Sequence, residues 1–136
     1  MGTKDVAVRF FTGLDEHDVD AALSGFADNA VYHGLQDRNG EISRADYAGK
    51  KRIREYLSTF LSTSAGGYMK YDLRSIEGDS KFVSVEWTDV ARSKDGTEYR
   101  NQGVNVFEFD EAGRAKDVRM YCDWSPLKAW KFTPDP

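Results

Sequence analysis

Four polar residues have side chains that could carry out acid–base chemistry: Asp89, Asn105, Tyr32 and His33. A carboxylate among aromatic side chains loses hydration, and its pKa then rises towards the range of a general base. A side-chain amide can donate a hydrogen bond to a carbonyl or to the enolate that forms from it. Histidine, with an ordinary pKa of about 6.5, can give or take a proton. These groups favour abstraction of a proton next to a carbonyl, dehydration or an aldol-type cyclisation.

Three of these residues also have a purely structural interpretation. Asp89 is near the end of a predicted strand and could be exposed before the turn that follows. Asn105 could be a buried amide that ties the sheet to the helices. His33 stands at the head of a polar stretch and could be structural or exposed. The single cysteine, Cys122, has no partnered histidine, so we expect it to line the core.

The composition argues against several other classes of protein. One cysteine provides no ligand cluster, and with two histidines a metal site would need carboxylates for most of its ligands, so we expect no metal. We expect no other cofactor either. A net charge of -4 argues against a nucleic-acid partner. No apolar run approaches about 18 residues, so we expect no membrane span. The N-terminal residues lack the apolar region of a signal peptide, which favours a cytoplasmic protein.

The hydrophobic pattern predicts three helices in the first half of the chain. Val6, Phe10 and Leu14 have helical spacing within residues 4–14. Asp18 is a candidate N-cap for a second helix over 19–26. A third helix is expected over 50–63, where apolar residues recur at i, i+3, i+4, i+7 and i+8. Before it, we expect a short extended segment over 30–33 and a long polar loop over 34–48.

From residue 69 the apolar pattern changes to a period of two, which predicts strands. We expect them over 69–76, 82–92, 99–110 and 115–124, as an antiparallel meander. Asp89 shares one face of its strand with Val83, Val85 and Trp87. The whole chain, 1–136, is then a single α+β domain. Its three N-terminal helices pack on a curved antiparallel sheet and enclose a cone-shaped pocket, which is a frequent place for small ligands.

Several short motifs occur in an order that resembles a known superfamily. They are FADNAV at 26–31, IREY at 53–56 after Gly49, VNVFEF at 104–109 followed by Gly113-Arg114, and YCD at 121–123. This order is similar to the nuclear transport factor 2-like superfamily, in its SnoaL-like and ketosteroid-isomerase-like branch. The resemblance covers nearly the whole chain and implies a cone-shaped α+β barrel. The superfamily contains isomerases, dehydratases, cyclases, epoxide hydrolases and proteins without catalysis, so fold alone implies no single activity.

The resemblance also implies a register for the strands, which period two alone does not fix. Asn105 matches the oxyanion-binding aspartate of the isomerases and would therefore face the pocket, whereas Asp123 would turn away. Tyr32 would lie on the short strand near the mouth. The implied wall of the substrate pocket consists of Phe10, Tyr56, Val85, Trp87, Phe107, Met120 and Cys122.

The chain departs from the family patterns at essential positions. The catalytic tyrosine of ketosteroid isomerases matches Phe10, and their general base matches Gly34, so steroid isomerisation by that mechanism is not expected. Limonene-type epoxide hydrolases are a partial match, because Tyr32 and Asp89 correspond to two of their catalytic residues. Their arginine corresponds to Trp87, and half of their catalytic set is absent.

We therefore expect an enzyme without a cofactor that acts on a small hydrophobic carbonyl compound. Asp89 would be the acid–base group, assisted by Asn105, Tyr32 or His33. The alternatives are an epoxide hydrolase that uses Asp89 and Tyr32, and a non-catalytic ligand-binding or scaffolding domain. Relatives commonly pair sheet against sheet, and we expect a homodimer. The outward residues Phe82, Val104 and Val106 and the tail residues Leu127, Trp130 and Phe132 are candidates for covering a neighbour, and the tail could instead close the pocket mouth.

Overall fold

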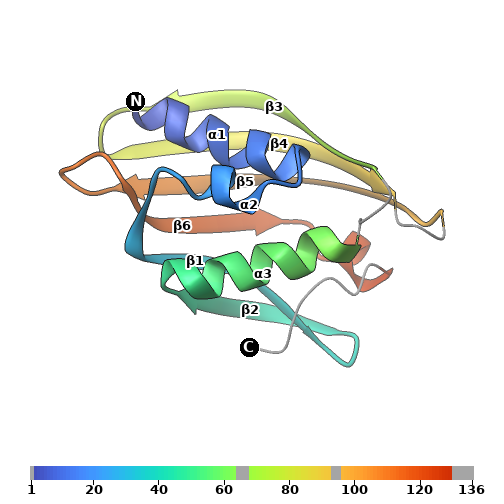
Figure 1. Cartoon of the computed structure of the whole chain (residues 1–136). Helices are drawn as coiled ribbons and strands as arrows, with labels where there is room; N and C mark the ends of the chain where they lie inside the picture. The colour runs from blue at the N-terminus through green and yellow to red at the C-terminus, as the bar shows by residue number, and fades with distance from the viewer. Residues whose placement is uncertain (1, 64–67, 93–95, 130–136) are drawn as a thin grey trace.

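The computed structural model describes residues 2–63, 68–92 and 96–129, in which helices pack on one curved sheet (Figure 1). The helices are α1 (Thr3–Asp15), α2 (Val19–Ala22), α3 (Lys50–Thr63) and the short 3-10 helix η1 (Ser125–Ala129). The strands are β1 (Phe26–Arg38), β2 (Glu41–Ala48), β3 (Tyr68–Gly78), β4 (Phe82–Arg92), β5 (Glu98–Phe109) and β6 (Ala115–Cys122). None of the described helices is long and apolar enough to cross a membrane.

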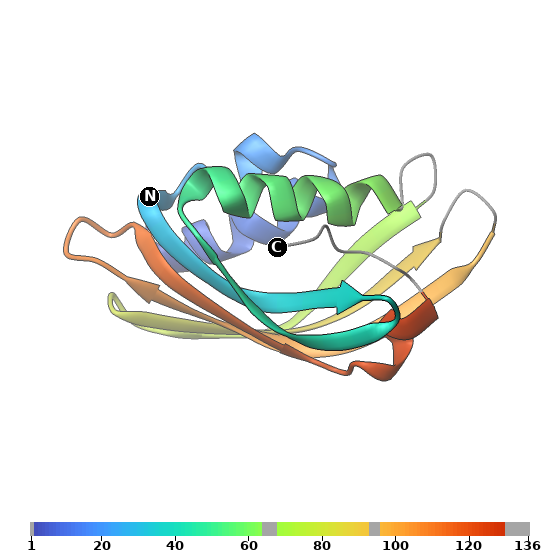
Figure 2. The same ribbon diagram turned by 90° about the horizontal axis from the view of Figure 1, so that it is seen from below.

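The six strands form a single mixed sheet in the order β2-β1-β6-β5-β4-β3. All neighbours are antiparallel except β1 and β6, which run parallel. The sheet is strongly curved and unclosed, and α1 and α3 lie over its concave face (Figure 2). The predicted α+β cone is therefore confirmed. The sheet is larger than the predicted four-stranded meander, because the N-terminal hairpin of β1 and β2 joins it through the parallel pair.

The expectation of a long loop over 34–48 is wrong, because these residues form most of the β1–β2 hairpin. Asn39 and Gly40 both have positive φ, at 55° and 86°, as the tightest class of hairpin turn requires. The Asp37 carboxylate supports the turn by accepting a hydrogen bond from the Gly40 backbone at 2.8 Å. The polar composition of β2 reflects its position as an exposed edge strand, which is a common way to discourage edge-to-edge pairing.

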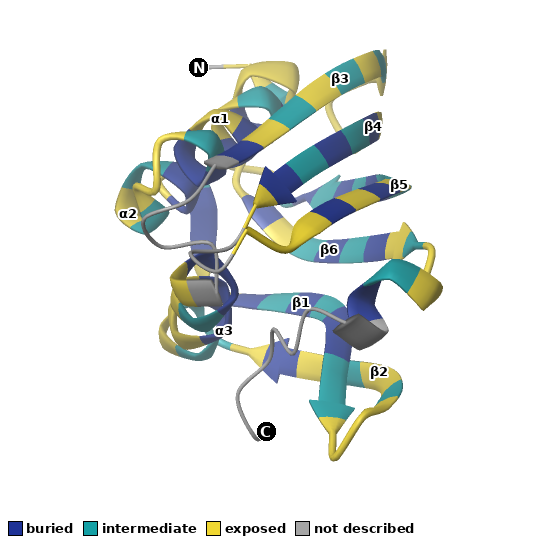
Figure 3. Cartoon of the chain, turned by 90° about the vertical axis from the view of Figure 1, so that its right-hand side faces the viewer, coloured by how far each residue is buried: buried dark blue, intermediate teal, exposed yellow. Residues whose placement is uncertain are grey.

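The helices form where their apolar stripes can be buried against the sheet (Figure 3). In α1 the predicted stripe is buried, including Phe10 and Phe11, and α3 has the predicted bounds of 50–63. The α2 helix ends at Ala22 rather than at the predicted residue 26, because Phe26 begins β1. Its predicted N-cap is confirmed by a 3.0 Å hydrogen bond from the Ala21 backbone to the Asp18 carboxylate.

Candidate active site

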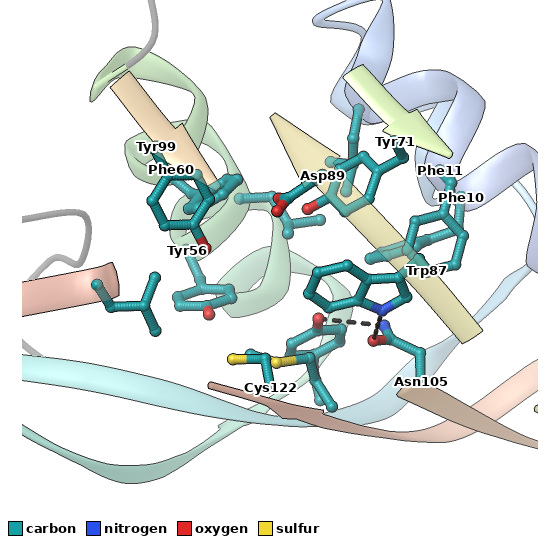
Figure 4. A pocket seen from close by; sticks show the side chains of 15 residues that line it. Phe10, Phe11, Tyr56, Phe60, Tyr71, Trp87, Asp89, Tyr99, Asn105 and Cys122 are labelled. Carbon is teal, nitrogen blue, oxygen red and sulfur yellow. Dashed lines mark hydrogen bonds between the residues drawn. The ribbon is translucent and has the colours of Figure 1, made fainter. Parts of the chain in front are cut away.

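A narrow cavity lies between the concave face of the sheet and helices α1 and α3 (Figure 4). Its open space is about 40 Å³. Aromatic and aliphatic side chains form most of the wall, and only a few polar groups reach it. The lining residues are Phe10, Phe11, Leu14, Tyr32, Tyr56, Leu57, Phe60, Tyr71, Trp87, Asp89, Tyr99, Asn105, Met120, Cys122 and Leu127.

Asp89 is buried on the concave face of β4, with only 2% of its surface exposed. The alternative in which it is exposed at the end of the strand is therefore wrong. Period two explains its position, because Val83, Val85 and Trp87 on the same face are buried as well. Neighbouring strands complete the surroundings, since Tyr71 of β3 and Asn101 of β5 both pair with Asp89 in the sheet.

The Asp89 carboxylate lacks the partners that a buried charge needs. Neither oxygen has a hydrogen bond of acceptable geometry to the described residues. Burial raises its pKa from the ordinary 3.8 to about 7. The Asn101 backbone and the Tyr71 hydroxyl act in the opposite direction, but without good hydrogen-bond geometry they do not outweigh burial. A carboxyl whose pKa is raised towards neutral pH can both take and return a proton.

Asn105 and Tyr32 form a hydrogen-bonded group at another part of the wall. The indole Nε1–H of Trp87 donates to Asn105 Oδ1 at 2.9 Å, and Asn105 Nδ2 lies 3.4 Å from the Tyr32 hydroxyl, to which it donates. Burial raises the pKa of Tyr32 well above its ordinary value, so its hydroxyl keeps its proton at neutral pH. The Asn105 amide and the Tyr32 hydroxyl are thus both hydrogen-bond donors at the cavity.

Two tyrosines near Asp89, Tyr71 and Tyr99, line the cavity but were not among the site residues predicted from the sequence. Tyr71 packs edge-on against Trp87, with ring centroids 5.3 Å apart, and Tyr99 accepts a 2.8 Å hydrogen bond from Asn101. Burial raises the pKa of both tyrosines, with the charge of Asp89 as the next cause. The available signal was strand pairing, because an antiparallel β3–β4 hairpin places Tyr71 directly beside Asp89.

His33 does not join the cavity, because adjacent residues of a strand point to opposite faces. Tyr32 faces inward, and His33 therefore faces outward. There its Nδ1 lies 2.7 Å from Asp46 of β2 and its Nε2 2.6 Å from Asp117 of β6. Burial acts to lower the pKa of His33, but the hydrogen bonds and charges of these two carboxylates outweigh it and raise the pKa overall.

The remaining expected wall residues divide into two groups. Phe10, Tyr56, Trp87, Met120 and Cys122 line the cavity as expected. Val85 and Phe107 are fully buried but are not part of its wall. Phe107 instead lies in the aromatic core beneath α1, with its ring centroid 5.6 Å from that of Phe10.

Two further positions limit the chemistry of the cavity. At Gly34, the position that matches the isomerase base, an added Cβ would lie 3.0 Å from the Tyr56 hydroxyl and 3.0 Å from the Tyr32 ring. A side chain there would therefore require the Tyr32 ring and the Tyr56 hydroxyl to shift slightly. Burial raises the pKa of the Cys122 thiol to about 12, so it is not a thiolate at neutral pH.

Other expectations concern metals and the chain's tail. Within the described ranges, no three His, Cys, Asp or Glu side chains gather closely enough to hold a metal ion. Leu127 of η1 contributes to the cavity wall. The expected roles of Trp130 and Phe132 fall outside the described residues.

The curved mixed sheet, with helices over a buried aromatic cavity, defines a cone-shaped α+β domain. The chain belongs to the SnoaL-like domain family, whose model matches residues 7–118. The resemblance predicted from the sequence motifs is therefore confirmed. No protein among curated sequences matches this chain.

Several solved structures share the fold. Bal32a, from a soil-derived mobile gene cassette, is 19% identical with a TM-score of 0.75, over 97% of this chain and 96% of its own. RV0760c from Mycobacterium tuberculosis, in complex with estradiol-17beta-hemisuccinate, is 13% identical with a TM-score of 0.75, over 93% and 98%. SalBIII, an epoxide hydrolase/cyclase-like enzyme with a role in pyran ring formation in the polyether salinomycin, is 20% identical with a TM-score of 0.70, over 91% and 92%. At these identities the likeness shows the fold alone.

Proposed function

We propose that this protein is an acid–base enzyme for small hydrophobic carbonyl compounds, of the isomerase, dehydratase or cyclase type, and that it works without a cofactor. The observation that carries the proposal is the Asp89 carboxylate, which is buried on the cavity wall without a hydrogen-bond partner among the described residues. Such a group costs free energy in the folded state, and unpaired buried polar groups with perturbed pKa values are concentrated at functional sites.

In the proposed reaction, ionised Asp89 removes a proton from the carbon next to the substrate carbonyl. The electron pair of that C–H bond forms the C=C bond of an enolate, and negative charge develops on the carbonyl oxygen. Asn105 Nδ2 and the Tyr32 hydroxyl donate hydrogen bonds to this oxygen. Protonated Asp89 then returns the proton to another carbon in an isomerisation or to a departing hydroxyl in a dehydration. In a cyclisation, the enolate carbon attacks a second carbonyl, whose oxygen takes the proton.

The arrangement of the polar groups also limits how a substrate can lie. Asp89 is two residues from Trp87 on the same face of β4, and Asn105 bonds to the Trp87 indole from β5 (Figure 4). A substrate that touches both must therefore lie along the indole ring, which favours a flat apolar compound. The open space of about 40 Å³ fits only a few water molecules. Substrate entry consequently requires some lining side chains to move.

Epoxide hydrolysis is the second candidate. It is supported by the combination of a carboxylate that can activate water, Asp89, with a protonated hydroxyl that can polarise an epoxide oxygen, Tyr32. The fold likeness to an epoxide hydrolase/cyclase-like enzyme is consistent with it. A non-catalytic ligand-binding or scaffolding domain is the third candidate, and it would use the same cavity without turnover.

One screen separates these candidates. Enolisable ketones are incubated with the protein in D₂O, and deuterium uptake next to the carbonyl is followed by NMR. Small epoxides are incubated in ¹⁸O-water, and ¹⁸O in the diol product is measured. We expect protein-dependent deuterium uptake that falls by about 10²–10⁴-fold in Asp89→Asn. The matched control is Asp72→Asn, because Asp72 is exposed and lies outside the cavity. Ligand binding without any turnover in the wild type would favour the non-catalytic domain.

We also infer that two copies pair through the convex face of the sheet. Phe82 and Tyr121 are 46% and 49% exposed on the described surface, which is unusual for large apolar side chains. Val104 pairs with Tyr121 in the sheet, whereas Phe82 lies opposite Glu108, further along β5. Sedimentation should give a dimer for the wild type and a smaller species for Tyr121→Glu. A monomeric wild type would contradict the inference.

A further inference from the structure

The Asn105 side chain can present either a hydrogen-bond acceptor or a hydrogen-bond donor to the cavity. Its amide has a carbonyl oxygen that only accepts hydrogen bonds and an NH₂ group that only donates them. Rotation of the amide by half a turn exchanges the two ends with almost no change of shape. A site built on Asn105 therefore has to fix this rotation before it can distinguish a carbonyl oxygen from a donor group.

The indole of Trp87 supplies the required asymmetry. Indole Nε1–H is a donor only, and it lies 2.9 Å from Asn105 Oδ1. Both side chains are buried, so water cannot replace a lost partner easily. If the amide were reversed, its NH₂ group would face the indole N–H, and two buried donors would lose their acceptor. The observed rotation directs Asn105 Nδ2 to the side of the Tyr32 hydroxyl.

A glycine allows the indole to reach this position. Trp87 pairs with Gly103 across β4 and β5, and Asn105 is two residues further along β5. A Cβ at Gly103 would lie 2.6 Å from Trp87 Cζ2, which is closer than real contacts permit. The indole therefore lies over a position where other residues would displace it, and its N–H group reaches along β5 to the amide.

We propose that Trp87 is a positioning residue that holds the Asn105 amide with its NH₂ group towards the cavity, so that the site selects ligands that present an acceptor oxygen. The ligand class is a carbonyl compound or a planar oxyanion, and isosteric compounds with a donor group at that point are rejected. The catalytic meaning of this selection rests on the function proposed above, but the amide orientation and the ligand selection do not.

The first test uses the protein without a ligand. In the ¹⁵N-labelled wild type, we expect slow hydrogen exchange of the Trp87 indole N–H and cross-relaxation between the Asn105 NH₂ group and the Tyr32 ring. Asn105→Ala should speed indole exchange by at least about tenfold at Trp87 and leave the half-exposed Trp124 unchanged. In Trp87→Phe, the cross-relaxation from Asn105 to Tyr32 should weaken. An unchanged Asn105 signal pattern in that variant would overturn the proposal.

The second test measures selection directly with two probes of one shape, 4-nitrophenolate and 4-nitroaniline. Both are coloured, and they differ in presenting an anionic acceptor or a donor. Trp87→Phe should lower the ratio of phenolate to aniline affinity by at least about threefold relative to the wild type, because the effect of Asp89 is present in both proteins and cancels in the comparison. The matched control is Trp124→Phe, which should keep the wild-type ratio.

The outcomes of the second test separate selection from simple packing. If Trp87→Phe weakens both probes equally, the indole only fills space and the proposal fails. If the ratio changes as expected but no ketone or epoxide is turned over in the screen, the proposed function fails while the positioning role stands. Far-UV circular dichroism of each variant confirms that the comparison is made between folded proteins.

Discussion

The concave and convex faces of the sheet differ in whether their charged groups have partners. On the concave face, Asp89 is buried and both of its oxygens lack a hydrogen-bond partner among the described residues. On the convex face, His33 is held between two carboxylates, and Asp117 is further bound by Arg119 at 2.7 Å. Paired charges at a surface have a modest structural effect, whereas an unpaired buried carboxylate is costly. This difference is what the proposed function depends on, because only the concave face holds a buried carboxylate without a hydrogen-bond partner among the described residues.

The largest expected effect concerns Asp89 and the pH dependence of stability. Its pKa is about 7 in the folded protein, against an ordinary value of 3.8, so the folded state binds more protons between these pH values. The unfolding free energy of the wild type should therefore fall as pH rises from 4 to 8, by about 4 kcal/mol from this group. Asp89→Asn should lack that component of the pH dependence, as measured by urea unfolding at each pH.

The control for this prediction is again Asp72→Asn, whose carboxylate is exposed. This variant should follow the wild-type pH dependence. If Asp89→Asn shows the same pH dependence of the unfolding free energy as the wild type, the buried carboxylate is not its cause. The contrast between the two faces would then be contradicted.

The next effect in size concerns the donors opposite the base. Tyr32→Phe removes one of two donors to the proposed enolate oxygen and should lower kcat by about 10²-fold. The pH–rate profile should keep its midpoint, because the base is unchanged. The Asn105–Tyr32 bond is long, at 3.4 Å, so thermal stability should change little. A shifted midpoint with unchanged kcat would instead assign Tyr32 to the environment of the base.

The smallest effect is expected on the convex face. The raised pKa of His33 means that its stabilising contribution is fully present below the unfolded-state value of 6.5 and is lost as pH rises through the folded-state value. His33→Gln should therefore lower the unfolding free energy by less than about 1 kcal/mol at pH 6 and by almost nothing at pH 9. Turnover should be unchanged. A large loss of turnover would indicate that His33 takes part in catalysis.

Much of the fold could be predicted from local patterns. The helix over 50–63 followed from its apolar stripe, and the burial of Asp89 beside Trp87 is consistent with period two along β4. The β1–β2 hairpin was missed although Asn39-Gly40 is a strong turn signal, because the polar edge strand β2 lacks hydrophobic alternation.

The parts of the site that escaped prediction depend on contacts between distant segments. Tyr99 reaches the cavity because β5 pairs with β4, where it lies opposite Ala91. Its bond to Asn101, two residues along the same strand, follows the period of two. The orientation of the Asn105 amide depends on an indole 18 positions away in the chain. The outward direction of His33 was predictable from the sequence, because a strand that turns Tyr32 inward turns His33 outward.

The most direct test of the account is the pKa of Asp89 itself. The side-chain carboxyl carbon can be followed by ¹³C NMR between pH 3 and 9 in the wild type, with Asp89→Asn used to assign the signal. We expect a midpoint of about 7 for Asp89. A midpoint near the ordinary 3.8 would mean that the carboxylate is hydrated or paired in solution, and it would contradict the proposed role of Asp89 as the general base.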